Sequence, residues 1–112
     1  MHVEFQLVPP RRKPGRRSRM RGAGQHLRAF VVLEGRRKVH LACATLPLKE
    51  RGAEVLLARC ESRLLERASP TKTELRRLMG KIKRRVRREL ADTRRQIRLH
   101  RAARRQIMEN RP

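Results

Sequence analysis

The chain has 112 residues, and its 32 basic residues against 10 acidic ones give a formal net charge of +22. This length allows one small domain, and the absence of Trp and Tyr, with only two Phe, excludes a large aromatic core and a binding surface of stacked rings. No apolar run is long enough to span a membrane, and the first ten residues lack the apolar region of a signal peptide, so we expect a cytoplasmic protein.

The positive charge is concentrated in two segments. Residues 11–28 carry +8 and residues 71–112 carry +12, whereas residues 29–70 carry only +3. Self-repulsion at this density opposes compaction, and a bound polyanion would relieve it. There are 26 Arg and 6 Lys, and Arg pairs bidentately with phosphate, which favours nucleic acid as the polyanion. A GC-rich genome that encodes Arg in place of Lys is the alternative explanation of this bias.

The N-terminal segment is predicted to be a strand followed by a basic loop. Residues 2–8 alternate apolar and polar side chains, as a half-buried strand does, and Pro9-Pro10 ends the pattern. Residues 9–24 combine Pro, Gly and Ser with seven basic residues and show no periodicity. We expect a loop there that becomes ordered on a phosphate backbone.

The next two segments are predicted to form a β-hairpin. Residues 26–33 and 38–44 are rich in aliphatic and β-branched side chains, and a short turn containing a glycine separates them. Val39, Leu41 and Cys43 occupy alternate positions of the second strand, so we expect these three side chains on its buried face.

A first amphipathic helix is predicted over residues 47–68. Pro47 suits the start of a helix, and Ser69-Pro70 ends it. Its apolar stripe recurs at spacings of three and four and consists of Ala53, Leu56, Leu57, Cys60, Leu64 and Ala68.

A second, long helix is predicted over residues 72–107. Thr71 and Glu74 form a capping box. The apolar stripe that follows is one residue wide, is surrounded by Arg and Lys, and consists of Leu75, Leu78, Ile82, Val86, Leu90, Thr93 and Ile97. Such a helix suits contact with a polyanion, or it packs half against the domain and leaves a solvated basic face.

The predicted fold class is therefore α+β. A small antiparallel sheet with strands at about 2–8, 26–33 and 38–44 is covered by the helix 47–68, and the long basic helix 72–107 follows. We expect residues 1–70 to form the domain, with its basic loop at 9–24, and residues 71–112 to form an Arg-rich helical extension.

No catalytic, metal or cofactor motif is evident. The sequence contains no HExxH, Walker or GxSxG motif, and most acidic side chains lie at ion-pair spacing from Arg. Cys43 and Cys60 match no zinc pattern, and the four His are scattered, so we expect both Cys to be small buried residues, with a structural zinc as the alternative. We expect no enzyme, no cofactor and no small-molecule substrate.

One short string resembles a catalytic loop. Gly22-Ala23-Gly24-Gln25-His26 resembles the Gly-Gly-Gln loop of release-factor-like peptidyl-tRNA hydrolases, with Ala23 in place of the first glycine. The resemblance implies that Gln25 and its backbone amide would position the hydrolytic water. The strand that this family has after its first helix is missing here.

A broader resemblance covers residues 3–68. A strand, a basic loop, a hairpin and an amphipathic helix follow in the order of the second half of the ribosome hibernation-promoting factor family. The resemblance implies part of a βαβββα fold with a basic face that binds in the mRNA and tRNA channel of the small subunit. Residues 45–50 read Thr-Leu-Pro-Leu-Lys-Glu where the family has an acidic, Tyr-containing helix start.

We therefore predict a non-enzymatic, ribosome-associated protein that binds ribosomal RNA, with a hibernation-type role in translation regulation. The predicted RNA-binding residues are Arg11, Arg12, Lys13, Arg16, Arg17, Arg19, Arg21, Arg36, Arg37, Lys38, Arg76, Arg77, Lys81, Lys83, Arg84, Arg85, Arg87, Arg88, Arg94 and Arg95. The alternatives are a ribosome-rescue hydrolase that uses Gln25 and a nonspecific DNA-binding protein. A membrane-surface role fits the charge, but the long helix lacks the Trp, Phe and broad Leu face of an interfacial helix.

Overall fold

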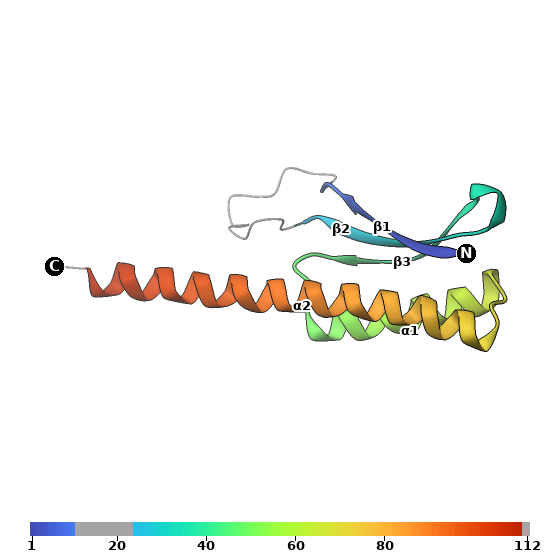
Figure 1. Ribbon diagram of the computed structural model, residues 1–112. Helices are drawn as coiled ribbons and strands as arrows, with labels where there is room; N and C mark the ends of the chain where they lie inside the picture. Colours follow the sequence, from blue (N-terminus) through green and yellow to red (C-terminus); the bar gives the residue numbers. More distant parts are fainter. Residues whose placement is uncertain (11–23, 111–112) are drawn as a thin grey trace.

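The computed structural model describes residues 1–10 and 24–110 (Figure 1). Its elements in chain order are β1 (His2–Val8), β2 (His26–Val32), a short 3-10 turn (Glu34–Arg36), β3 (Lys38–Thr45), α1 (Glu50–Arg67) and α2 (Lys72–Glu109). The predicted α+β class, with three strands followed by two helices, is confirmed. The basic loop predicted between the first two strands falls almost entirely on residues 11–23, outside the described residues.

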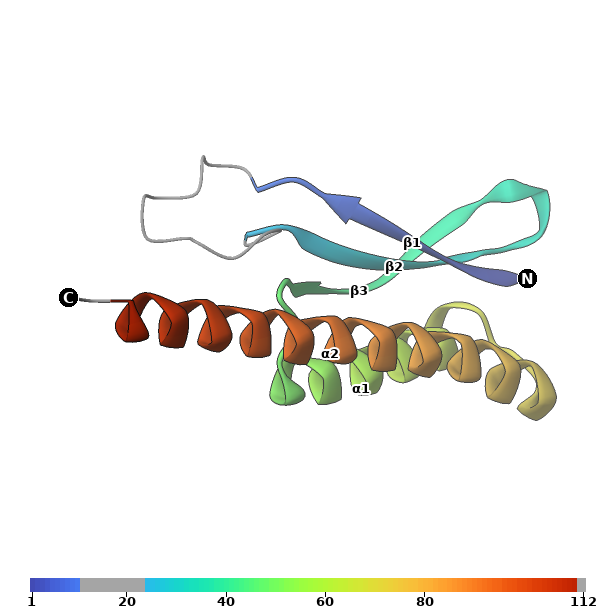
Figure 2. The same ribbon diagram turned by 60° about the vertical axis from the view of Figure 1, so that its left-hand side comes forward.

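The three strands form an antiparallel sheet in the order β1-β2-β3. In its register Val3 lies opposite Val31, and Leu27 lies opposite Ala44. Both helices cover the same face of this sheet, with α1 packed against β3 and α2 passing beside β1 (Figures 1 and 2). The molecule therefore has two layers, and each outer strand lies above a different helix.

The turn between β2 and β3 requires left-handed backbone geometry. Gly35 has φ of +76°, and the following residue, Arg36, has φ of +63°. Glycine adopts this region without the steric cost that a Cβ atom imposes. The backbone N–H of Leu33 donates to the carbonyl of Arg37 at 2.8 Å and closes the turn. The predicted hairpin is thus confirmed, with its glycine in the turn.

The predicted burial of Cys43 is wrong, and a β-bulge explains why. Phe30 lies opposite His40, whereas the preceding residue of β2 lies opposite Ala42, so Leu41 is an extra residue in β3. An extra residue reverses the alternation of side chains beyond it. Leu41 and Ala42 are consequently both buried, and Cys43 is exposed.

The first helix begins three residues later than predicted, at Glu50 in place of residue 47. The backbone of Leu46 still belongs to the sheet, because its N–H donates to the carbonyl of Gln25 at 2.8 Å and its carbonyl accepts from Gly24 at 3.3 Å. Leu46 and Leu48 also place their side chains in the core. The helix therefore starts only after this apolar segment, with Lys49 as its N-cap.

Both helices contribute to one core. In α1 the buried side chains of the predicted stripe are Ala53, Leu56, Cys60 and Leu64. In α2 the side chains that join the same core are Leu78, Met79, Ile82 and Val86. Burial raises the pKa of the Cys60 thiol to about 12. The first turns of α2 are therefore part of the packed body.

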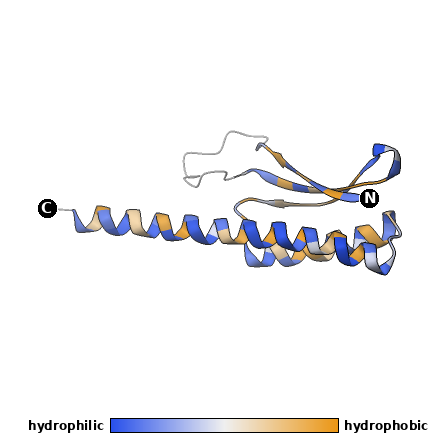
Figure 3. Cartoon of the chain, in the orientation of Figure 1, coloured by the Kyte–Doolittle hydropathy of each residue, from blue (hydrophilic) through white to orange (hydrophobic). Residues whose placement is uncertain are grey.

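The second half of α2 extends beyond the body (Figure 1). Ile97 is 39% exposed, whereas Leu99 and Ile107 are more than half exposed. The capping box predicted at the start of this helix is confirmed, because the Thr71 hydroxyl accepts from the Glu74 N–H and the Glu74 carboxylate accepts from the Thr71 N–H, both at 3.2 Å. Figure 3 shows hydrophilic residues along most of the extended part.

Candidate nucleic-acid interface

Four basic residues of α2 form a row on the side of the helix that faces β1. Arg77, Lys81, Arg84 and Arg88 follow one another at spacings of four, three and four, which places them on one face of a helix. The guanidinium of Arg77 donates to the carbonyl oxygen of Met1 at 2.8 Å, which ties the row to the start of β1. The row covers about 16 Å of the helix axis.

A groove lies between this row and β1. It has a volume of about 490 Å³ and is lined by Phe5, Lys81, Arg84, Arg85 and Arg88. We call it the β1–α2 groove. Its lining contains four cations and one aromatic ring, and no carboxylate of the described residues. The groove is therefore strongly cationic and suits an anionic ligand.

Arg85 has a structural role in the β1–α2 groove. Its Nε lies 3.0 Å from a carboxylate oxygen of Glu89, and the two side chains are only 20% and 14% exposed. Its guanidinium carbon lies 5.3 Å from the centre of the Phe5 ring, within the range of a cation–π contact. Because Glu89 neutralises Arg85, three cations remain to attract an anion, and none of them belongs to an ion pair within residues 1–10 and 24–110.

Two predicted binding residues farther along α2 form ion pairs with carboxylates of the protein. Arg94 pairs with Glu50 at the start of α1. Arg95 lies 3.4 Å from Asp92, one turn earlier in the same helix. Each of these two guanidinium groups therefore already has a carboxylate partner within the protein. The remaining predicted residues of α2 outside the row are Arg76, Lys83 and Arg87. All three are exposed, and none of them takes part in an ion pair in the described part of the chain.

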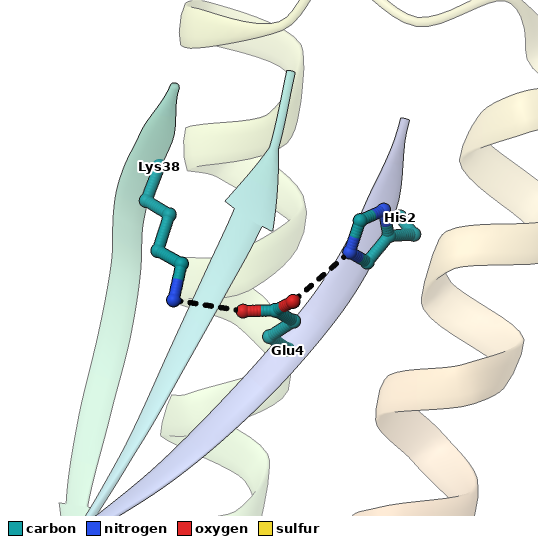
Figure 4. A network of polar contacts seen from close by, with 3 residues as sticks. All are labelled: His2, Glu4 and Lys38. Carbon is teal, nitrogen blue, oxygen red and sulfur yellow. Dashed lines mark hydrogen bonds and ion pairs between the residues drawn. The ribbon is translucent and has the colours of Figure 1, made fainter. Parts of the chain in front are cut away.

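The three predicted residues of the hairpin differ from one another. Lys38 lies 3.0 Å from one carboxylate oxygen of Glu4, and the His2 ring lies 3.1 Å from the other oxygen (Figure 4). Hydrogen bonds from His2 and Lys38 lower the pKa of Glu4. Arg36 and Arg37 are exposed in the turn, at the end of the molecule where α2 begins (Figures 1 and 2).

The predicted loop residues Arg11, Arg12, Lys13, Arg16, Arg17, Arg19 and Arg21 lie outside the described residues. The described residues that flank this segment are Pro10 and Gly24, and Gly24 has φ of +84°. A Cβ atom at Gly24 would lie 3.2 Å from the Pro10 side chain. Pro10 and Gly24, the described residues on either side of this segment, therefore lie together at the end of the sheet opposite the hairpin turn.

Gln25, the residue of the hydrolase alternative, is half-buried where β2 begins. It lines a second groove, of about 250 Å³, together with Leu7, Leu46, Pro47, Glu89, Asp92, Thr93 and Gln96. Its carbonyl is bonded to the N–H of Leu46, so the backbone on this side of Gln25 belongs to the sheet. Gly22 and Ala23 lie outside the described residues, and the catalytic role of Gln25 stays a prediction.

Across the described ranges, no group of three or more His, Cys, Asp or Glu side chains could hold a metal ion. Within the same ranges, no helix combines the length and the apolar character that a membrane span needs.

Comparison of the chain with protein-family models, with curated proteins and with solved structures gives no match. The two family resemblances therefore depend on the quoted residues alone, and what they imply stays a prediction.

Two residues of the interface, Phe5 and Glu89, carry no sequence signal that marks them as part of a binding site. The sequence predicts Phe5 in a strand, but its contact with Arg85 depends on which helix passes beside that strand. The sequence predicts that acidic side chains such as Glu89 pair with an Arg at helical spacing, but the position of this pair in the wall of the groove follows only from the folded structure. The hydrophobic alternation of β1 is the only sequence signal that pointed to the inward side of Phe5.

Proposed function

We propose that this protein binds ribosomal RNA without catalysis and regulates translation at the ribosome, in the cytoplasm. The observation that carries the proposal is the β1–α2 groove, where three cations lie side by side without a carboxylate partner in the described part of the chain. A phosphate backbone that follows the groove would contact Lys81, Arg84 and Arg88 in succession. The net charge of +22 adds a long-range attraction to any nucleic acid.

The arrangement supports RNA recognition by shape. The 38 residues of α2 extend over about 57 Å, and the α+β body holds only the first half of this helix. A rigid basic rod fixed to a compact body can follow phosphates along a folded RNA, whose helices are recognised mostly by shape and backbone. Arg85 and Phe5 keep the groove wall in place while the three free cations contact the ligand.

Sucrose-gradient sedimentation of lysate that contains the full chain tests the proposal. At low salt the protein should sediment with a ribosomal subunit, and high salt should release it, because the contacts are electrostatic. The triple variant Lys81→Gln, Arg84→Gln and Arg88→Gln should move to the top of the gradient at low salt.

A matched control removes the same charge elsewhere. The triple variant Lys38→Gln, Arg94→Gln and Arg95→Gln also loses three cations, but each of these is already paired with a carboxylate. It should stay with the ribosomal subunit. Equal release of both variants would show that binding follows net charge alone, and wild-type protein that stays at the top at low salt would refute ribosome association.

A further inference from the structure

A second cationic groove lies on the opposite edge of the sheet, between β3 and α1. It has a volume of about 280 Å³ and is lined by His40, Leu41, Ala42, Cys43, Arg59, Ser62 and Arg63. We call it the β3–α1 groove. None of its residues belongs to the RNA-binding set predicted from the sequence. Because β1 and β3 are the outer strands of a three-stranded sheet, the two grooves lie on opposite sides of the body, with about 10 Å between the outer strands.

The charges of the β3–α1 groove are all positive. Arg59 and Arg63 lie one turn apart on α1, and no ion pair of the described residues includes either of them. No Asp or Glu is among the described residues that line the groove. Arg28, on the neighbouring strand, adds a third guanidinium close enough to affect His40.

The pKa of His40 responds to the positive potential of this groove. Its ring packs edge-on against Phe30, with 5.4 Å between the ring centres. Partial burial lowers the pKa of His40, and the charges of Arg28 and Arg63 lower it further. A neutral imidazole keeps one N–H donor, and a nearby anion would reverse the effect of the guanidinium groups.

We propose that the β3–α1 groove is a second binding site for nucleic-acid phosphate, so that one copy of the protein bridges two RNA segments. The inference rests on the proposed function, since it assumes that the β1–α2 groove holds the first segment. Two guanidinium groups one turn apart can fork onto one phosphate, and the Ser62 hydroxyl and the His40 ring line the same groove and supply further donors. Charge complementarity selects the ligand, because a groove with cations only on its walls favours a polyanion over an acidic side chain.

The test mixes the full-length protein with two short RNA duplexes, one carrying a fluorescence donor and the other an acceptor. Wild-type protein should bring the two duplexes together and produce energy transfer when the protein concentration is below that of the RNA. The variant Arg59→Gln with Arg63→Gln should lose the transfer, while its affinity for a single duplex falls by less than about tenfold. Sedimentation equilibrium should count two duplexes per wild-type chain and one per variant chain.

A matched control and an independent signal complete the test. The variant Arg51→Gln with Arg67→Gln removes two charges from the same helix outside the groove and should keep the transfer. The pKa of His40, followed by NMR, should rise when RNA is added to the wild-type protein and should stay unchanged in the Arg59→Gln, Arg63→Gln variant.

The outcomes separate the two proposals. If wild-type protein binds one duplex but never two, or if both double variants keep the transfer equally, the second site does not exist. If wild-type protein binds no RNA, the proposed function itself fails. A circular-dichroism melt that matches wild type shows that each variant is folded.

Discussion

Removal of the three free cations of the β1–α2 groove should flatten the salt dependence of RNA binding. The perturbation is the triple variant Lys81→Gln, Arg84→Gln and Arg88→Gln, and Gln keeps the helix because its helix propensity is close to that of Lys and Arg. Each phosphate contact contributes about 0.7–0.9 to the slope of log K against log salt. Three lost contacts should therefore lower the magnitude of the slope by about 2.1 to 2.7.

The size of this effect is easily measured. Between 50 and 200 mM salt, a slope change of this size corresponds to a factor of about 20 to 40 in affinity. The wild-type protein should lose that much more affinity than the variant over this range. Fluorescence anisotropy with a short labelled RNA duplex, measured at four or five salt concentrations, gives both slopes.

The paired-cation variant Lys38→Gln, Arg94→Gln and Arg95→Gln is the control. It has the same net charge as the groove variant, but its cations are held by Glu4, Glu50 and Asp92. Its slope should equal that of the wild type. Identical slopes for the groove variant and the wild type would refute the assignment of these three cations to phosphate contacts.

The remaining predictions concern the fold and the enzymatic alternative. Ile82→Ala removes a side chain that is fully buried between helix and sheet, so thermal unfolding should show a loss of about 2–5 kcal/mol, and a loss below 1 kcal/mol would contradict the packing of α2 on the body. Thr71→Ala removes half of the capping box and should lower stability by about 1 kcal/mol in the same assay. Iodoacetamide at pH 8 should modify the exposed Cys43 and spare Cys60, whose thiol has a pKa of about 12, and mass spectrometry of the labelled peptides would reveal the opposite pattern. Gln25→Ala should leave RNA affinity unchanged, whereas loss of a peptidyl-tRNA hydrolysis activity on stalled ribosomes in this variant alone would favour the hydrolase alternative.

The elements of the fold could be predicted because each has a local signal. Alternation marked β1, the glycine turn marked the hairpin, and the capping box at Thr71 marked the start of α2. The sequence could not predict which side chains of β3 are buried after Leu41, because the bulge at Leu41 depends on pairing with a neighbouring strand. The helix α1 starts later than the sequence predicts for a similar reason, since Leu46 completes the sheet before the helix begins.

The sequence predicts which residue types form the candidate site, but it does not predict where on the surface the site lies. The sequence shows that α2 is surrounded by Arg and Lys, yet it does not show which of them face β1. Arg85 and Arg88 look alike in the sequence, but Glu89 neutralises the first and the second remains free to contact a ligand. Both arginines have a carboxylate four residues later, but Glu89 pairs with Arg85, whereas Asp92 pairs with Arg95 and leaves Arg88 without a partner in the described part of the chain. The sequence does not show which of these alternative pairs within the helix forms.

The central claim is that RNA occupies the β1–α2 groove, and the ring of Phe5 tests it most directly. The chain has only two Phe, so both rings can be labelled with carbon-13 and observed by NMR. The Phe5→Leu variant keeps only the Phe30 ring, and the signals that disappear in it belong to Phe5. When one equivalent of a ribosomal RNA duplex is added at low salt, the Phe5 ring signals should shift, because phosphates and ribose enter the groove that this ring lines. Unchanged Phe5 signals in a sample whose anisotropy shows that the RNA is fully bound would contradict the account.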